Sequence, residues 1–252
     1  MDLTFVTGTA GSGKSYLTNA LKSWYVSRGE DAIAVNLDPG VLSLPYEPDV
    51  DVRQTIDMQQ IMEEYSLGPN GALILAADMV ATKLSEIQDE IDSYRAEYVI
   101  VDTSGQTELF AFRESGEYIV KEMKADSKVL LFLLDPLLAN TPANFLSLAL
   151  LSASVGLRMT VPKITVMTKR DIAREGAKRI VEWSRDAAVF EDALATTKDS
   201  EQYSLYSDLF RSLRRLSFGA DLYPVSSTTQ EGMVALVGEI TRMGRGGEEL
   251  TD

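Results

Sequence analysis

The sequence predicts an α/β fold in which a mainly parallel central sheet lies between two layers of helices. Three observations support this prediction. Short apolar, β-prone runs alternate with segments of helical periodicity along the chain. The first of these runs is followed by a glycine-rich turn and then by a helical pattern. Polar residues recur where the apolar runs end, at the edge where parallel sheets bind their ligands.

The first strand is expected at residues 3–6, and the turn GTAGSGKS at 8–15 fits the pattern G-x-x-x-x-G-K-[ST]. In such a loop, backbone N–H groups point at phosphate oxygens, and the following helix adds a partial positive charge. Lys14 is expected to reach the β- and γ-phosphates, and Ser15 to ligate Mg²⁺. The alternative is a glycine-rich turn that binds nothing. The predicted phosphate site consists of Gly8, Gly11, Ser12, Gly13, Lys14, Ser15 and the adjoining Tyr16.

The helix after this loop is expected to bury one face. That face consists of Tyr16, Leu17, Ala20, Leu21 and Trp24. Further strands are expected at 32–36, 98–102, 129–134, 164–168 and 222–225. Each is followed by a helical pattern, which indicates βαβ units and therefore a three-layer P-loop NTPase fold.

Two stretches interrupt this alternation. Residues 51–96 are expected to hold two helical segments around a Gly-Pro-Asn-Gly turn at 68–71, with no clear strand. Residues 172–218 are expected to form a charged helical insertion before the last strand. We interpret the chain as one domain, residues 1–252, that carries these two insertions. The tail, 244–252, is glycine- and acid-rich and is expected to fray.

An uncharged stretch in the second half of the chain is expected to belong to the core. Thr141 and Pro142 fit an N-cap and a first-turn proline that open a buried helix. The apolar segment that follows, 145–157, is too short to span a bilayer.

Composition narrows the chemistry that the chain can carry out. Its 252 residues include 24 Lys and Arg, 38 Asp and Glu, and no Cys or His, so the net charge is −14. The lack of Cys and His excludes disulfides, Cys/His zinc sites and Ser–His–Asp triads. Any metal must have oxygen ligands, which suits Mg²⁺. The acidic balance disfavours nucleic acid and membranes as partners, and no signal peptide opens the chain, so we expect a soluble cytoplasmic protein.

A second motif, DTSGQTE at 102–108, begins where an expected strand ends. Asp102 is placed to hold Mg²⁺ through a water, and the N–H of Gly105 to approach a γ-phosphate. Gln106 and Glu108 are expected to orient or deprotonate the attacking water. Asp38, at the end of the expected strand 32–36, is a candidate for the metal shell or for contact with that water. An ordinary turn or helix start could also place these residues there.

A third motif, TKRD at 168–171, follows another expected strand. It matches the N-K-x-D pattern of GTP-binding proteins, with Thr168 in place of asparagine. In that pattern Asp171 accepts hydrogen bonds from guanine N1 and N2, and the stem of Lys169 stacks on the ring. Adenine has no donors at those positions, so an unpaired carboxylate would disfavour it. Ser226, after the last strand, is expected in the base-contacting loop; Asp171 could alternatively cap the next helix.

Together with the Gly-Pro-Asn turn at 68–70, these motifs resemble the GPN-loop GTPases, in particular their archaeal type. The resemblance covers nearly the whole chain. Two positions depart from the usual pattern, Ser104 where proline is common and Thr168. The resemblance implies a homodimer in which the Gly-Pro-Asn loop of one subunit enters the active site of the other. Asn70 would then contact the partner's γ-phosphate region and the attacking water.

The resemblance also implies a function, namely Mg²⁺-dependent hydrolysis of GTP to GDP by a dimeric switch. Protein partners are expected, because eukaryotic relatives are linked to the assembly of RNA polymerase. Three alternatives stay open: a related dimeric ATPase, a small-molecule kinase, and a scaffold that nucleotide only stabilises. Dimeric ATPases usually carry a second lysine where this chain has Thr9. The expected catalytic residues are Lys14, Asp38, Asn70, Gln106 and Glu108, and the expected metal ligands are Ser15, Asp38 and Asp102.

Competition between GDP, GTP, ADP and ATP for the purified protein tests the role of Asp171. We expect both guanine nucleotides to displace a bound guanine probe far better than either adenine nucleotide, because Asp171 pairs only with guanine. Equal competition by all four would contradict the assignment of the third motif.

Overall fold

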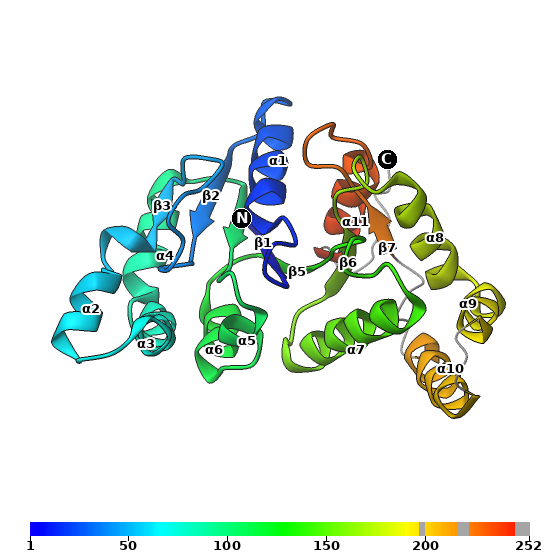
Figure 1. The fold of residues 1–252 in the computed structure, drawn as a ribbon. Helices are drawn as coiled ribbons and strands as arrows, with labels where there is room; N and C mark the ends of the chain where they lie inside the picture. Colours follow the sequence, from blue (N-terminus) through cyan, green and yellow to red (C-terminus); the bar gives the residue numbers. More distant parts are fainter. Residues whose placement is uncertain (197–199, 216–221, 245–252) are drawn as a thin grey trace.

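The computed structural model describes residues 1–196, 200–215 and 222–244 (Figure 1). Its strands form one parallel sheet in the order β3-β2-β4-β1-β5-β6-β7. The strands are β1 (Asp2–Gly8), β2 (Ala32–Asn36), β3 (Val50–Asp51), β4 (Tyr98–Asp102), β5 (Ser127–Leu134), β6 (Lys163–Met167) and β7 (Leu222–Pro224). The chain crosses over between neighbouring strands, as βαβ units require.

Helices connect these strands. The helices before β4 are α1 (Lys14–Val26), a 3₁₀ turn η1 (Val52–Gln54), α2 (Met58–Glu64), α3 (Pro69–Thr82) and α4 (Leu84–Tyr94). Those after β4 are α5 (Thr107–Ala111), α6 (Glu114–Glu122), α7 (Pro142–Arg158), α8 (Arg174–Arg185), α9 (Ala187–Ala195), α10 (Ser200–Arg215) and α11 (Met233–Gly244).

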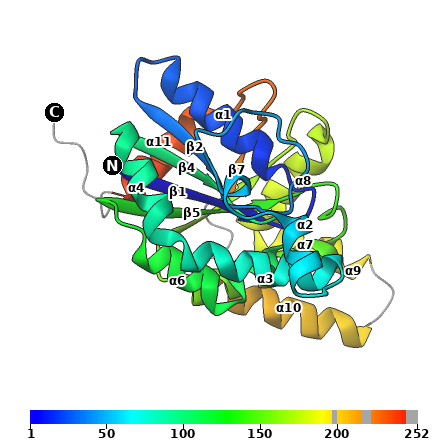
Figure 2. The same cartoon turned by 90° about the vertical axis from the view of Figure 1, so that its left-hand side faces the viewer.

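The sheet is covered on both faces, which explains why its strands are almost wholly apolar. In β5, Leu130 and Phe132 pack into a core shared with α3 to α7, whereas Leu131 and Leu133 pack against α1 and α11. Figure 1 shows α1 and α11 above the sheet, and Figure 2 shows α3 and α6 on the side opposite α1. The predicted three-layer arrangement is therefore confirmed.

A third core lies beyond the two layers, where α7 meets α8, α9 and α10. It centres on the aromatic rings of Phe145, Trp183, Phe190 and Phe210. The centroids of Phe190 and Phe210 are 4.0 Å apart. On its outer side, Arg211 pairs with Glu191 at 2.7 Å, so this arginine serves an acidic partner within the insertion.

The predicted strands are all present, each within two residues of its expected ends. The prediction for residues 51–96 was wrong in two respects: the segment holds three helices, and Val50–Asp51 pairs with β2 as a short edge strand. A two-residue strand has no detectable alternation of apolar and polar residues, and this one forms only by pairing with β2. The described part of 172–218 is helical as expected, whereas most of the predicted frayed tail lies outside the described residues.

The expected buried face of α1 needs one correction. Leu17 and Leu21 are fully buried, but Tyr16 is 63% exposed. Tyr16 lies in the first turn of α1, where it borders a pocket, whereas Leu17 and Leu21 pack into the core.

Helix α7 begins as predicted. Thr141 caps it by accepting a hydrogen bond from the Asn144 N–H, and Pro142 is its first residue. Phe145 is buried in the third core, while Leu157 is 80% exposed near the end of the helix. No helix in the described ranges is both long enough and apolar enough to cross a membrane.

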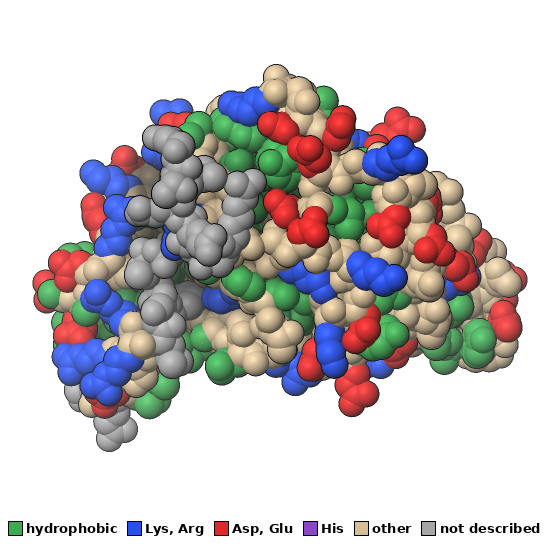
Figure 3. Space-filling model, turned by 180° about the vertical axis from the view of Figure 1, so that it is seen from behind, with side chains coloured by type: hydrophobic (Ala, Val, Ile, Leu, Met, Phe, Trp, Pro, Cys, Tyr) green, Lys and Arg blue, Asp and Glu red, His purple; other side chains and the backbone are tan. Residues whose placement is uncertain are grey.

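The described residues on the face opposite the view of Figure 1 include both acidic and basic side chains. Figure 3 shows acidic and basic side chains interspersed on that face.

A half-buried lysine joins α7 to the start of β6. Lys163 Nζ donates to Ser152 Oγ at 2.7 Å and to Thr165 Oγ1 at 3.3 Å. Gly156 makes room for it, since a Cβ there would lie 2.9 Å from Lys163 Cε. Burial lowers the pKa of Lys163 to about 8.

Lys163→Met is therefore expected to change how stability depends on pH. Between pH 8 and about 10.4, the lysine is largely neutral in the native state but still charged in the unfolded chain. The unfolded state then binds more protons, so the free energy of unfolding of the wild type rises with pH relative to the variant. Urea unfolding of both proteins at pH 7.5, 9 and 10 measures the difference. Parallel pH profiles would show that Lys163 titrates normally.

Candidate functional site

The glycine-rich loop connects β1 directly to α1. Gly8 has a φ of +151° and Gly13 a φ of +94°, conformations that favour glycine. A Cβ on Gly8 would lie 2.8 Å from the carbonyl oxygen of Leu133, so a larger residue does not fit there. The loop therefore turns sharply into the first turn of α1, whose N–H groups have no intrahelical acceptors and are suited to an anion.

The Lys14 ammonium lies inside this loop, and the residue is 6% exposed. Nζ donates to the carbonyl oxygens of Gly8 at 2.9 Å, Thr9 at 3.0 Å and Gly105 at 3.0 Å. These bonds engage all three of its protons. Burial lowers the pKa of Lys14, while nearby carboxylates, chiefly Asp102, oppose that shift. The loop thus holds a positive charge beside the N-terminus of α1.

Asp38 joins the segment after β2 to the segment after β4. Its Oδ2 accepts a hydrogen bond from the Gly105 N–H at 2.7 Å, and its Oδ1 accepts one from the Gly40 N–H at 3.0 Å. Both carboxylate oxygens therefore serve backbone donors, so Asp38 shapes the site in this structure. Its predicted role toward a metal or water stays a prediction.

Asp102 ends β4 and is 2% exposed. Its Oδ2 accepts a hydrogen bond from the Tyr46 hydroxyl at 3.1 Å, whereas its buried Oδ1 has no hydrogen-bond partner among the described residues. Burial raises the pKa of Asp102 to about 6, while the nearby Ser15 hydroxyl, the bond from Tyr46 and the charge of Lys14 act in the opposite direction. A buried carboxylate oxygen without a donor is suited to a cation or its bound water.

These residues line one pocket of about 280 Å³, the phosphate pocket, whose polar lining includes Lys14, Ser15, Asp38 and Asp102. Hydroxyl and carboxylate oxygens are the donors that Mg²⁺ prefers. The described part of the chain contains no cluster of three or more acidic side chains that could hold a metal by itself. The residues therefore fit Mg²⁺ bound jointly with nucleotide phosphates and water.

A second pocket, of about 520 Å³, brings together Asn70, Gln106 and Glu108. Asn70 is the second residue of α3, and all three residues are exposed. This pocket adjoins the phosphate pocket, since Gln106 follows Gly105 in the chain. Asn70 of the Gly-Pro-Asn turn thus lies beside Gln106 and Glu108 of the second motif within one subunit.

The TKRD motif contacts the glycine-rich loop directly. Thr168 Oγ1 donates to the Ser12 carbonyl oxygen at 2.7 Å, and Lys169 Nζ donates to that of Gly11 at 2.7 Å. We call residues 168–171 the base-recognition turn. Its Asp171 is half-buried and makes no hydrogen bond or ion pair with a described residue, so its carboxylate is available to a ligand.

The loop after β7 lies beside this turn. The Arg170 N–H donates to the Val225 carbonyl oxygen at 3.2 Å. Ser226 is fully buried, and its Oγ accepts a hydrogen bond from the Thr229 N–H at 3.0 Å. Ser226 therefore shapes the loop through its side chain.

Two polar residues of this site escaped the sequence analysis. Tyr46, which contacts Asp102, lies in an irregular segment whose sequence gives no indication of its partner. Asp135 directly follows β5 and accepts a hydrogen bond from Lys169 Nζ at 2.6 Å. It could have been found by the rule that singled out Asp38 and Asp102, because it also follows a buried strand.

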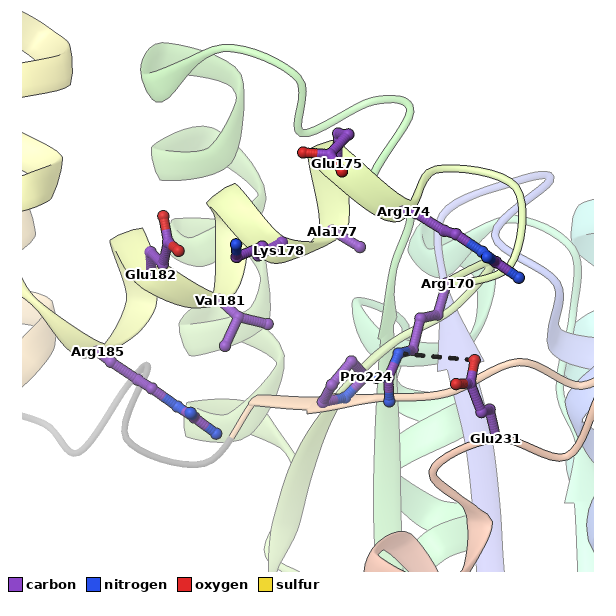
Figure 4. A pocket seen from close by; sticks show the side chains of 10 residues that line it. All are labelled: Arg170, Arg174, Glu175, Ala177, Lys178, Val181, Glu182, Arg185, Pro224 and Glu231. Atoms are coloured by element: carbon purple, nitrogen blue, oxygen red, sulfur yellow. Dashed lines mark ion pairs between the residues drawn. The ribbon is translucent and has the colours of Figure 1, made fainter.

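A further hollow, of about 670 Å³, lies between α8 and the end of β7 (Figure 4). Arg170 points toward Glu231 there, with 3.8 Å between the paired atoms. The hollow contains no glycine-rich turn and none of the predicted site residues, so we do not assign the nucleotide to it.

Comparison with known proteins gives consistent matches. A family model described as "Conserved hypothetical ATP binding protein" matches residues 6–245. The GPN-loop GTPase QQT2 of Arabidopsis thaliana is 32% identical over 85% of this chain and 59% of its own length. The GPN-loop GTPase 1 of Saccharomyces cerevisiae is 28% identical over 89% of this chain and 61% of its own length.

A solved structure also matches, that of a GTPase in apo form from Pyrococcus abyssi. It is 28% identical, with a TM-score of 0.83, and the match covers 96% of this chain and 97% of that one. The chain spans only 59% and 61% of the length of the Arabidopsis and yeast relatives. Agreement of sequence family and fold over nearly all of its residues shows that this protein belongs to the GPN-loop GTPase family.

Proposed function

We propose that the chain hydrolyses GTP to GDP and phosphate with bound Mg²⁺ and acts as a homodimeric switch. The observation that carries the proposal is the direct joining of the base-recognition turn to the glycine-rich loop by Thr168 and Lys169. These two hydrogen bonds fix the distance between the residues expected to bind a purine base and the residues expected to bind its phosphates.

Guanine is the base that this arrangement favours. Asp171 has a carboxylate without a described partner, and guanine N1 and N2 offer two donors to it. The Arabidopsis and yeast relatives and the Pyrococcus abyssi protein are named as GTPases, which supports the same substrate. The description of the family model as ATP-binding favours the ATPase alternative, which nucleotide competition tests.

In the proposed reaction, Lys14 and the loop amides stabilise charge that develops on the phosphate oxygens. Ser15 would hold Mg²⁺, with Asp38 and Asp102 in its outer shell, and the ion would neutralise part of the triphosphate charge. Gln106 and Glu108 orient the water for in-line attack. Because Asn70 is neutral, it cannot supply the charge of an arginine finger, and turnover should be slow.

Dimerisation would place the Gly-Pro-Asn loop of each subunit at the partner's site. Asn70 is exposed and Ile74 is 40% exposed, so both can reach a partner subunit, and this exposure supports this part of the proposal. By resemblance to the family, we extend the proposal to the assembly of protein complexes such as RNA polymerase, with proteins as partners.

GTPase assays on single variants test the catalytic assignments. We expect Lys14→Ala to lower kcat/KM at least about a hundredfold, because it removes the buried charge beside the phosphates. Gln106→Ala and Asn70→Ala should each lower kcat by about tenfold to a hundredfold through loss of water positioning. Parent-like rates in all three variants would show that the active site lies elsewhere.

Mixing two variants of low activity tests whether Asn70 acts in the active site of its own subunit or in that of the partner. In a mixed dimer of Asn70→Ala and Lys14→Ala subunits, one site has an intact Lys14 and receives Asn70 from the partner. Equal mixing and subunit exchange should then restore about a quarter of the wild-type rate. If Asn70 serves its own subunit, the mixture will be no more active than the average of the two variants.

A further inference from the structure

Asp135 holds a buried negative charge at the end of β5, and the residue is 4% exposed. Its Oδ2 accepts a hydrogen bond from Lys169 Nζ at 2.6 Å, and its Oδ1 accepts one from the Leu137 N–H at 2.9 Å. The carboxylate is therefore fixed by the backbone on one side and bonded to the lysine on the other. A charge-assisted bond of this kind is shorter and stronger than a neutral one.

Lys169, which donates this bond, has an unusual backbone conformation. Its φ is +56°, in the left-handed region that non-glycine residues rarely adopt. Its side chain leaves the base-recognition turn and ends between two acceptors, Asp135 and the carbonyl oxygen of Gly11. Anchoring the end of a long, flexible side chain fixes the path of its aliphatic stem.

We propose that Asp135 is a positioning residue for guanine recognition. It holds the ammonium of Lys169 so that the stem already lies where the purine ring stacks. This inference rests on the proposed function, since it assumes a guanine nucleotide at the base-recognition turn. Without the carboxylate, Lys169 keeps only the Gly11 carbonyl oxygen as its partner, and its stem can leave the stacking position.

The proposed role has two consequences that a general loss of stability does not share. Asp135 acts through Lys169, so its removal should have little effect once Lys169 has been replaced. Removal of Asp135 should also weaken binding of the base and leave binding of the phosphates unchanged, because the bonds that Lys14 makes in the glycine-rich loop do not involve Asp135.

Titration calorimetry of the wild type, Asp135→Asn, Lys169→Met and the double variant tests both consequences. GDP and inorganic tripolyphosphate, which lacks a base, are the probes. We expect Asp135→Asn to weaken GDP binding about tenfold and to leave tripolyphosphate affinity within about twofold. The double variant should bind GDP about as weakly as Lys169→Met alone.

Asp49→Asn is a matched control. Asp49 Oδ2 accepts a bond from Lys22 Nζ at 2.6 Å and one from the Ala34 N–H at 2.7 Å, far from the base-recognition turn. It should leave the affinity for both probes unchanged. Asp135→Glu keeps the charge and should recover part of the GDP affinity, and it serves as the test if Asp135→Asn does not fold.

Several results would overturn the inference. These are an unchanged GDP affinity in Asp135→Asn, an equal loss for tripolyphosphate, additive effects in the double variant, or a folded Asp135→Glu protein no better than Lys169→Met. Wild-type protein that binds tripolyphosphate but not GDP would instead overturn the proposed function.

Discussion

The buried ammonium of Lys14 is the constraint around which the phosphate pocket is built. It forms no ion pair with a described residue, and three carbonyl oxygens hold it instead. Carbonyl dipoles offset only part of the cost of burying a charge, and the lowered pKa of Lys14 reflects the remainder. A phosphate would supply the missing negative charge. The charge that costs stability in the protein therefore favours anion binding, even in a chain whose net charge is −14.

The base-recognition side depends on packing farther from the pocket. The turn follows β6, whose last residue, Met167, belongs to the third core together with Phe145, Phe190 and Phe210. These aromatic rings support the end of the sheet from which the turn projects. The insertion after the turn therefore has a structural role at the site, although none of the predicted site residues belongs to α8, α9 or α10.

The sequence was informative where glycines or acidic residues directly follow a strand. Glycines and acidic residues that follow apolar runs located the loop at Gly8 and the residues Asp38 and Asp102, because strand and loop are local features. It could not reveal β3, whose two residues pair only once β2 is in place. Nor could it reveal the contact between Tyr46 and Asp102, which lie 56 residues apart. Such contacts depend on the tertiary arrangement and have no local pattern.

The amide of Gly105 has a single N–H, and in this structure the Asp38 carboxylate accepts a hydrogen bond from it, with 2.7 Å between nitrogen and oxygen. A phosphate oxygen in the neighbouring pocket can accept a hydrogen bond from this N–H only by displacing the carboxylate. The two acceptors are therefore mutually exclusive. Asp38 also accepts a hydrogen bond from the Gly40 N–H, at the start of the segment that leads to Tyr46. A single backbone donor thus couples the position of the Asp38 carboxylate to what occupies the neighbouring pocket.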